Sequence, residues 1–197
     1  MPARFLTDMA VNRALTRTFA IGDEFLDDRG LDAFDDDDAI YVIAFDRVGG
    51  AYLGSVRLRP TVKSTLLRDA APYLLEFGET IESPRIWELS RLCTTTRSEH
   101  RRRHGADAVA GELAAAAFEV AGRAGVNQFV CVTDDPTFHA LERIGCAPKL
   151  KPRPASGPGS APHVVFLDVG QIPLKRIQNR RAKAAMVEFR GNLAERR

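Results

Sequence analysis

At 197 residues and a formal net charge of +2, the chain has the size of one α/β or α+β domain and lacks the basic excess typical of nucleic-acid binding. Hydrophobic residues make up 45% and charged residues 27%, as in ordinary globular proteins. No apolar run approaches the ~20 residues of a membrane span, and the N-terminus lacks a signal-peptide core. We therefore expect a cytoplasmic protein without a membrane segment.

The first half of the chain predicts a helical start followed by an antiparallel hairpin. Apolar residues at roughly helical spacing come first, and a run rich in aspartate follows them. Two apolar strands come next, one on each side of a Gly-Gly turn. A short helix follows the second strand, which ends at a proline because proline cannot donate to a sheet. The expected elements are a helix at 4–28, an acidic run at 27–38, strands at 39–48 and 51–58, and a helix at 64–76.

The second half predicts a central strand, and then strands alternating with helices. The alanine-rich helix ends at Gly125, a residue favoured just after a helix C-terminus. A loop of proline, glycine and serine at 151–162 precedes the last strand. The expected elements are strands at 85–95, 127–133 and 163–169, helices at 109–124 and 135–144, and a basic helix at 175–197.

Three cysteines, Cys93, Cys131 and Cys146, have no metal-ligand spacing. An odd number in a cytosolic chain favours buried free thiols over disulfides, and we expect no metal site. Packing is therefore the favoured role of the cysteines over nucleophilic catalysis, because no histidine is placed in the sequence to activate them.

Charged residues within apolar strands are the candidate functional groups. Glu88 and Arg91 lie three residues apart, so on an ideal strand they point to opposite faces. Arg57 stands among small and apolar residues and needs a carboxylate, which the acidic run can supply. A half-exposed strand with a surface ion pair, beside a solvated acidic loop, is the alternative interpretation.

The order of elements is similar to that of the N-acetyltransferase superfamily. This resemblance implies a three-layer α/β (α+β) sandwich whose mixed sheet has a V-shaped split between its central strands. In that architecture the pantetheine arm of a thioester lies in the split, bonded to open strand edges. Here the split would lie between residues 85–95 and 127–133.

Several short motifs, in order, resemble the acyl-homoserine-lactone (autoinducer) synthases over roughly residues 10–150. They are Leu31-Asp32-Ala33-Phe34-Asp35, Gly54-Ser55-Val56-Arg57-Leu58-Arg59-Pro60-Thr61, Trp87-Glu88-Leu89-Ser90-Arg91, Gly111-Glu112-Leu113 and Val132-Thr133-Asp134. The resemblance implies one domain at 1–174, with the basic helix at 175–197 as part of it.

The resemblance also implies a reaction that produces a quorum-sensing signal. S-adenosylmethionine accepts an acyl group on its amine from acyl carrier protein or acyl-CoA and then closes to a homoserine lactone, releasing methylthioadenosine. S-adenosylmethionine is a substrate here, the donor carries an acyl-phosphopantetheine, and no cofactor is tightly bound. The family's charged cluster corresponds to Asp32, Asp35, Arg57, Glu88 and Arg91.

Each residue type suits this chemistry. Asp32 and Asp35 favour a substrate that carries a sulfonium and an ammonium. Glu88 is the candidate base that deprotonates the amine, because a partly buried carboxylate can titrate near neutral pH. Arg57 and Arg91 lock the carboxylates in place or bind the substrate carboxylate.

Further substrate contacts follow from the same resemblance. An arginine about twenty residues before the acidic motif is matched best by Arg13 and next by Arg17. Ser90 and Thr133 are candidates for sensing the acyl chain, with ordinary strand-end hydrogen bonding as the alternative. The expected aromatic contacts are Phe19, Phe25 and Trp87.

Basic segments offer a docking face for an acidic carrier protein. The candidates are Arg101, Arg102 and Arg103 and the C-terminal basic helix, which is equally well explained as a solvated helix. Two other functions stay open. One is a CoA-dependent N-acyltransferase of the same fold that acts on another amine, and the other is a nucleic-acid-binding regulatory module.

Overall fold

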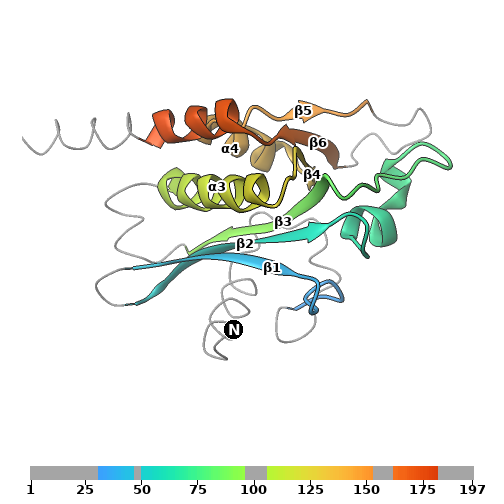
Figure 1. Cartoon of the computed structure of the whole chain (residues 1–197), viewed down its shortest axis with the longest axis horizontal. Helices are drawn as coiled ribbons and strands as arrows, with labels where there is room; N and C mark the ends of the chain where they lie inside the picture. The colour runs from blue at the N-terminus through green and yellow to red at the C-terminus, as the bar shows by residue number, and fades with distance from the viewer. Residues whose placement is uncertain (1–30, 47–49, 96–105, 153–161, 182–197) are drawn as a thin grey trace, which may run out of the picture.

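The computed structural model describes residues 31–46, 50–95, 106–152 and 162–181. In this part of the chain, six strands form one mixed sheet in the order β1-β2-β3-β4-β6-β5 (Figure 1). The strands are β1 Ile40–Phe45, β2 Tyr52–Pro60, β3 Ile86–Thr94, β4 Gln128–Thr133, β5 Lys149–Leu150 and β6 His163–Asp168. The helices are η2 Leu66–Ala70, η3 Pro72–Leu74, α3 Ala106–Arg123, α4 Asp135–Ile144 and a helix whose described part covers residues 171–181.

The sheet opens between its two central strands. β3 and β4 are parallel and pair only from Ile86 with Gln128 to Glu88 with Val130. Beyond this point β3 stays paired with β2 on one side, and β4 stays paired with β6 on the other. The expected split between the central strands is therefore confirmed, because no further ladder pair joins β3 to β4 beyond Glu88 and Val130 in the described residues.

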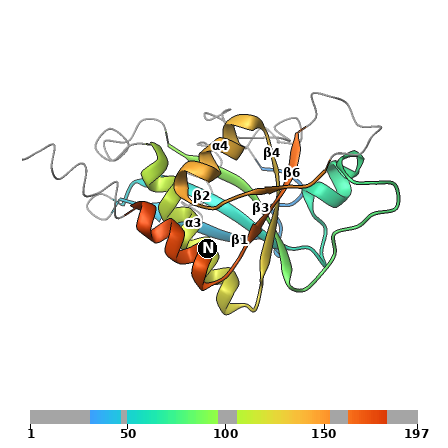
Figure 2. The same ribbon diagram turned by 90° about the horizontal axis from the view of Figure 1, so that it is seen from above.

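Helices cover one face of the sheet. Leu113 and Phe118 of α3 are buried against strand residues such as Phe129, whose ring lies 5.4 Å from that of Phe118 in an edge-on arrangement. Ile177 of the helix at 171–181 joins the same core, and Figure 2 shows this helix beside α3. This packing buries the apolar stripe of α3 and provides the largest core of the described residues.

A second core covers the opposite face over β4 and β6. Leu66, Leu67 and Leu74 of η2 and η3 pack there with Val130 and Val164. The half of the sheet formed by β4 and β6 thus lies between two layers, which confirms the expected mixed α/β sandwich. None of the helices in the described residues is long and apolar enough to cross a membrane.

The cysteines are packing residues. All three are buried thiols outside any disulfide, as expected. Burial raises the pKa of the Cys131 thiol well above its ordinary value and that of Cys146 to about 12. Both thiols therefore stay protonated at neutral pH, and a protonated thiol is a poor nucleophile.

Several element boundaries differ from the sequence-based expectation, most clearly in the helices. The helix expected at 64–76 divides at Ala71 into a π-helix and a 3-10 helix, because Pro72 lacks an N–H group and disfavours helical geometry in the residue before it. The helix expected at 109–124 begins at Ala106, and the basic helix begins at 171 instead of 175. The two-residue strand β5 was not expected, since its exposed residues carry no alternating pattern.

Gly54 marks a close approach of β2 to β3. A Cβ atom at this position would lie 2.6 Å from the backbone oxygen of Cys93. Gly54→Ala is therefore expected to lower the free energy of unfolding by about 1–3 kcal/mol, measured by urea denaturation. The matched control is Gly122→Ala in α3, where nothing lies within 4 Å, and we expect a gain of up to about 1 kcal/mol. Equal stability of the two variants would contradict the close approach.

Candidate active site

The acidic loop, defined here as residues 31–38, is a turn held together by its own aspartates. The Asp35 N–H donates to the Asp32 carbonyl at 3.0 Å, and the Phe34 N–H donates to Asp32 Oδ1 at 2.9 Å. In return the Asp32 N–H donates to Asp35 Oδ2 at 2.8 Å. Aspartate favours such turns because its short side chain reaches nearby main-chain N–H groups. These hydrogen bonds fix the directions of both carboxylates within the loop.

Asp32 is the centre of a buried charge cluster. Arg57 donates to both of its carboxylate oxygens, with Nη2 3.1 Å from Oδ2, and Arg91 donates to Oδ2 from Nε at 3.0 Å and Nη2 at 2.7 Å. Arg57 also donates to Asp35 at 2.8 Å and to Ser90 Oγ at 3.1 Å. Burial disfavours the charge of Arg57, but the hydrogen bond and charge of Asp32 outweigh burial and raise the pKa of Arg57. The guanidinium therefore stays charged inside the protein.

A bulge in β3 brings Arg91 into this cluster. Ser55 pairs with Cys93 and Arg57 with Ser90, so three steps along β3 match two along β2. Arg91 has a φ of +54°, a left-handed conformation that costs a residue other than glycine about 1–3 kcal/mol. The bulge turns Arg91 to the face of Arg57, whereas an ideal strand would send it to the other face. The expectation that Glu88 and Arg91 face apart is therefore wrong.

Glu88 lies on the same face of the sheet, directly opposite Arg59 in the register. Its side chain is fully buried, and its oxygens accept hydrogen bonds from the N–H groups of Leu66 at 3.3 Å and Leu67 at 2.9 Å. Burial raises the pKa of Glu88, although these N–H groups and the charges of Arg57 and Arg59 act to lower it. Glu88 is thus a buried carboxyl with a raised affinity for a proton, as a general base near neutral pH requires.

The other expected site residues are placed differently. Trp87 packs with the helix-side core, because it precedes Glu88 and so faces the opposite side of the strand. Thr133 is buried at the far end of β4 and pairs with His163, and its Oγ1 has no hydrogen-bond partner among the residues that the structure describes. The structure therefore does not bring Trp87 and Thr133 to the cluster around Asp32. Residues outside the described ranges are Arg13, Arg17, Phe19, Phe25, Arg101, Arg102 and Arg103.

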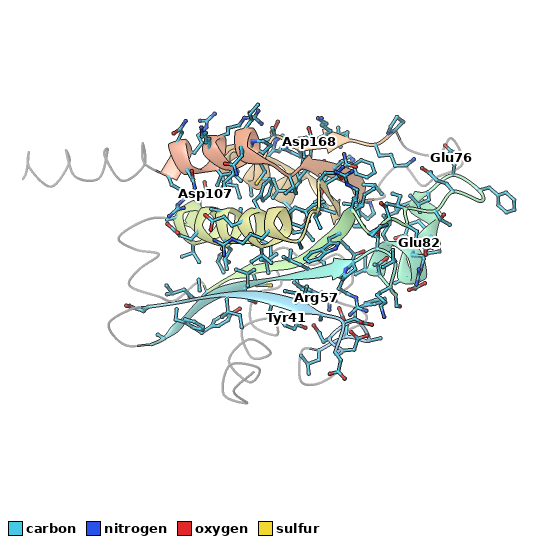
Figure 3. All side chains as sticks on the ribbon, in the orientation of Figure 1. Tyr41, Arg57, Glu76, Glu82, Asp107 and Asp168 are labelled. Atoms are coloured by element: carbon cyan, nitrogen blue, oxygen red, sulfur yellow. The ribbon has the colours of Figure 1, made fainter. Side chains whose placement is uncertain are left out.

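Two further residues of the site were not identified from the sequence. The Tyr41 hydroxyl donates to Asp35, and Figure 3 shows Tyr41 and Arg57 together on the side of the sheet away from Asp107 of α3. Arg59 is completely buried and contacts the acidic loop. Its spacing from Arg57 was a usable signal, since residues two apart on a strand share a face. In the described ranges no group of three or more metal-ligating side chains is placed to hold a metal ion.

One known protein family has a model that matches most of this chain. The family model described as autoinducer synthase matches residues 23–177. The chain belongs to the autoinducer synthase family. The resemblance seen in the sequence motifs is thereby confirmed, and the charge cluster lies within the part of the chain that the family model covers.

One curated protein and one solved structure show how similar the chain is to individual proteins. An acyl-homoserine-lactone synthase of Ralstonia nicotianae is 34% identical over 115 residues, which are 58% of this chain and 56% of the relative. The chain thus matches little more than half the length of this curated relative. A structure of TofI in a ternary complex with an inhibitor and MTA is 27% identical, with a TM-score of 0.67, and the match covers 90% of this chain and 91% of TofI.

A more distant structure supports the fold alone. BjaI, a CoA-dependent acyl-homoserine lactone synthase solved with SAM and isopentyl-CoA, is 24% identical with a TM-score of 0.66. The match covers 91% of this chain and 79% of BjaI. The chain therefore shares its overall fold with BjaI.

Proposed function

We propose that this chain is an acyl-homoserine-lactone synthase. In the proposed reaction the amine nitrogen of S-adenosylmethionine attacks the carbonyl carbon of an acyl thioester, an amide bond forms and the thiol leaves. The methionine carboxylate then attacks its own γ-carbon, the bond from that carbon to sulfur breaks, and methylthioadenosine leaves with the sulfur. The product is an acyl-homoserine lactone, which serves as a quorum-sensing signal.

The buried cluster around Asp32 is the observation that carries this proposal. Asp32 and Asp35 offer carboxylates for a substrate with an ammonium and a sulfonium, because opposite charges attract strongly where water is excluded. Arg57 and Arg91 hold those carboxylates and present guanidinium groups that suit the carboxylate of the same substrate. A substrate with two cationic groups and one anionic group matches this mixture of side chains.

Glu88 is proposed as the base. The ammonium of S-adenosylmethionine must lose a proton before its nitrogen can attack a thioester. A carboxylate that is fully buried and has a raised pKa takes up such a proton more readily than an exposed one. The N–H groups of Leu66 and Leu67 fix the direction of the Glu88 carboxylate and leave further lone pairs free for the proton.

The split beside Glu88 is proposed as the place of the acyl donor. Beyond the pair of Glu88 with Val130, the described parts of β3 and β4 form no further ladder pair, and a pantetheine arm can bond to such strand edges as an added strand does. We propose Ser90 and Thr133 as contacts of the acyl group. Both an acyl carrier protein and acyl-CoA carry this pantetheine arm, so the donor is proposed as an acyl-phosphopantetheine thioester.

The test uses the full chain, S-adenosylmethionine and one acyl group carried either by acyl carrier protein or by CoA. Mass spectrometry should detect methylthioadenosine and the acyl-homoserine lactone in equal amounts with at least one donor. Transfer of the acyl group to another amine without methylthioadenosine would overturn the proposal in favour of an ordinary N-acyltransferase. Absence of any transfer, together with salt-dependent DNA binding, would favour a regulatory module.

A further inference from the structure

Arg59 is a second buried arginine of the site, and it bonds to two backbone carbonyls as well as to Asp36. Its Nη1 donates to the Phe34 carbonyl at 2.7 Å and its Nε to the Ser64 carbonyl at 2.8 Å. The same guanidinium pairs with Asp36, with Nη2 3.2 Å from Oδ2. Arg57, in contrast, donates to the side-chain oxygens of Asp32, Asp35 and Ser90. Arg57 thus holds functional groups, whereas Arg59 holds two stretches of main chain.

The ring of Phe34, a residue of the acidic loop, lies beside the guanidinium groups of both Arg57 and Arg59. Its ring is buried, and the guanidinium carbons of Arg57 and Arg59 lie 5.7 Å and 5.9 Å from the ring centre. At these distances the negative face of an aromatic ring attracts a cation. The loop is therefore held to β2 at three adjacent points, which are the Arg57 carboxylate contacts, the Phe34 ring and the Arg59 contacts.

The second stretch of main chain held by Arg59 leads directly to Glu88. The Ser64 carbonyl accepts a hydrogen bond from Arg59. Leu66 and Leu67 follow two and three residues later, and their N–H groups hold the Glu88 carboxylate. Arg59 is also the register partner of Glu88 across β2 and β3. One planar guanidinium thus connects the loop that carries Asp32 and Asp35 with the segment that orients Glu88.

We infer that Arg59 is a positioning residue that fixes the distance between the substrate-binding carboxylates and the base. This inference rests on the proposed function for its kinetic consequences and on the contacts above for its structural ones. Arg59 does not need to touch substrate, because its hydrogen bonds go to Phe34, Ser64 and Asp36. Its planar guanidinium fits three acceptors at once, a geometry that a lysine ammonium does not offer.

Hydrogen exchange of the full chain tests the structural part without any assumption about the reaction. In Arg59→Leu the amides of Phe34 and Asp35 and those of Leu66 and Leu67 should exchange about tenfold faster or more, while amides of β4 and β6 keep their protection. Asp36→Asn should affect only the acidic loop, because it leaves the Ser64 contact in place.

The matched control is Arg85→Leu, which removes an exposed arginine near the start of β3. An exchange pattern in Arg59→Leu equal to that of Arg85→Leu would overturn the inference, and so would faster exchange throughout the chain.

Kinetics then test the consequence for the reaction. Arg59→Leu should raise the KM for S-adenosylmethionine about tenfold or more and lower kcat, and leave the KM for the acyl donor unchanged. An unchanged KM for S-adenosylmethionine in a folded, active Arg59→Leu protein would refute the positioning role. If the wild-type chain releases no methylthioadenosine, the proposed function fails, and the exchange experiment still decides whether Arg59 positions the two segments.

Discussion

Asp32→Asn is expected to reduce lactone synthesis by more than about 100-fold and to lower the free energy of unfolding by about 3–5 kcal/mol. Asp32 is completely buried and accepts hydrogen bonds from both Arg57 and Arg91. An asparagine keeps the shape but loses the charge, so two buried guanidinium groups remain with one fewer counter-charge. Its amide nitrogen also faces a guanidinium donor where an acceptor is required. Thermal denaturation and the rate of methylthioadenosine release measure the two effects.

The control for this substitution lies in the same loop. Asp38 is about half exposed, and its ion pair with Lys63 at 3.4 Å is also exposed, so Asp38→Asn should change stability by less than about 1 kcal/mol. Activity should stay near that of the wild type. Equal effects of the two substitutions would show that net charge of the loop, and not the buried cluster, determines stability and activity.

Glu88→Gln is expected to lower kcat by about 100- to 10,000-fold, the usual contribution of a general base. Glutamine keeps an oxygen for one of the two N–H groups of Leu66 and Leu67 but cannot take up the substrate proton. The matched control is Glu82→Gln, whose carboxyl is 52% exposed near Arg68. We expect the control to retain full activity. An active Glu88→Gln variant would assign the proton transfer to another group.

The pH dependence gives a second test of Glu88. Burial raises its pKa above the ordinary 4.5, so the folded chain binds this proton more tightly than the unfolded chain. The contribution of Glu88 to the free energy of unfolding should therefore fall as the pH rises from 4.5 through the raised pKa, because the unfolded chain releases the proton first. Over the same interval kcat/KM should rise, since the base acts in its ionised form. Glu88→Gln should remove both trends, and their persistence would refute the role of Glu88.

The sequence predicted secondary structure correctly where a residue's neighbours in the chain determine that structure. The strands around Arg57 and Glu88 and the helix that ends before Gly125 follow from hydropathy period and capping, which act over a few residues. The need of Arg57 for a carboxylate followed from the cost of an unpaired buried charge, and Asp32 and Asp35 satisfy it.

The sequence by itself determined the residue types of the site, the strands and helices that carry them, and the family that shares them. The tertiary structure alone decided how they meet. A bulge reverses the face of Arg91, strand alternation sends Trp87 to the opposite core, and Arg59 bonds to the carbonyl of Phe34, which lies 25 positions earlier in the chain. These outcomes depend on strand register and on contacts between residues far apart in the chain, and a one-residue change of register turns a side chain to the other face of the sheet.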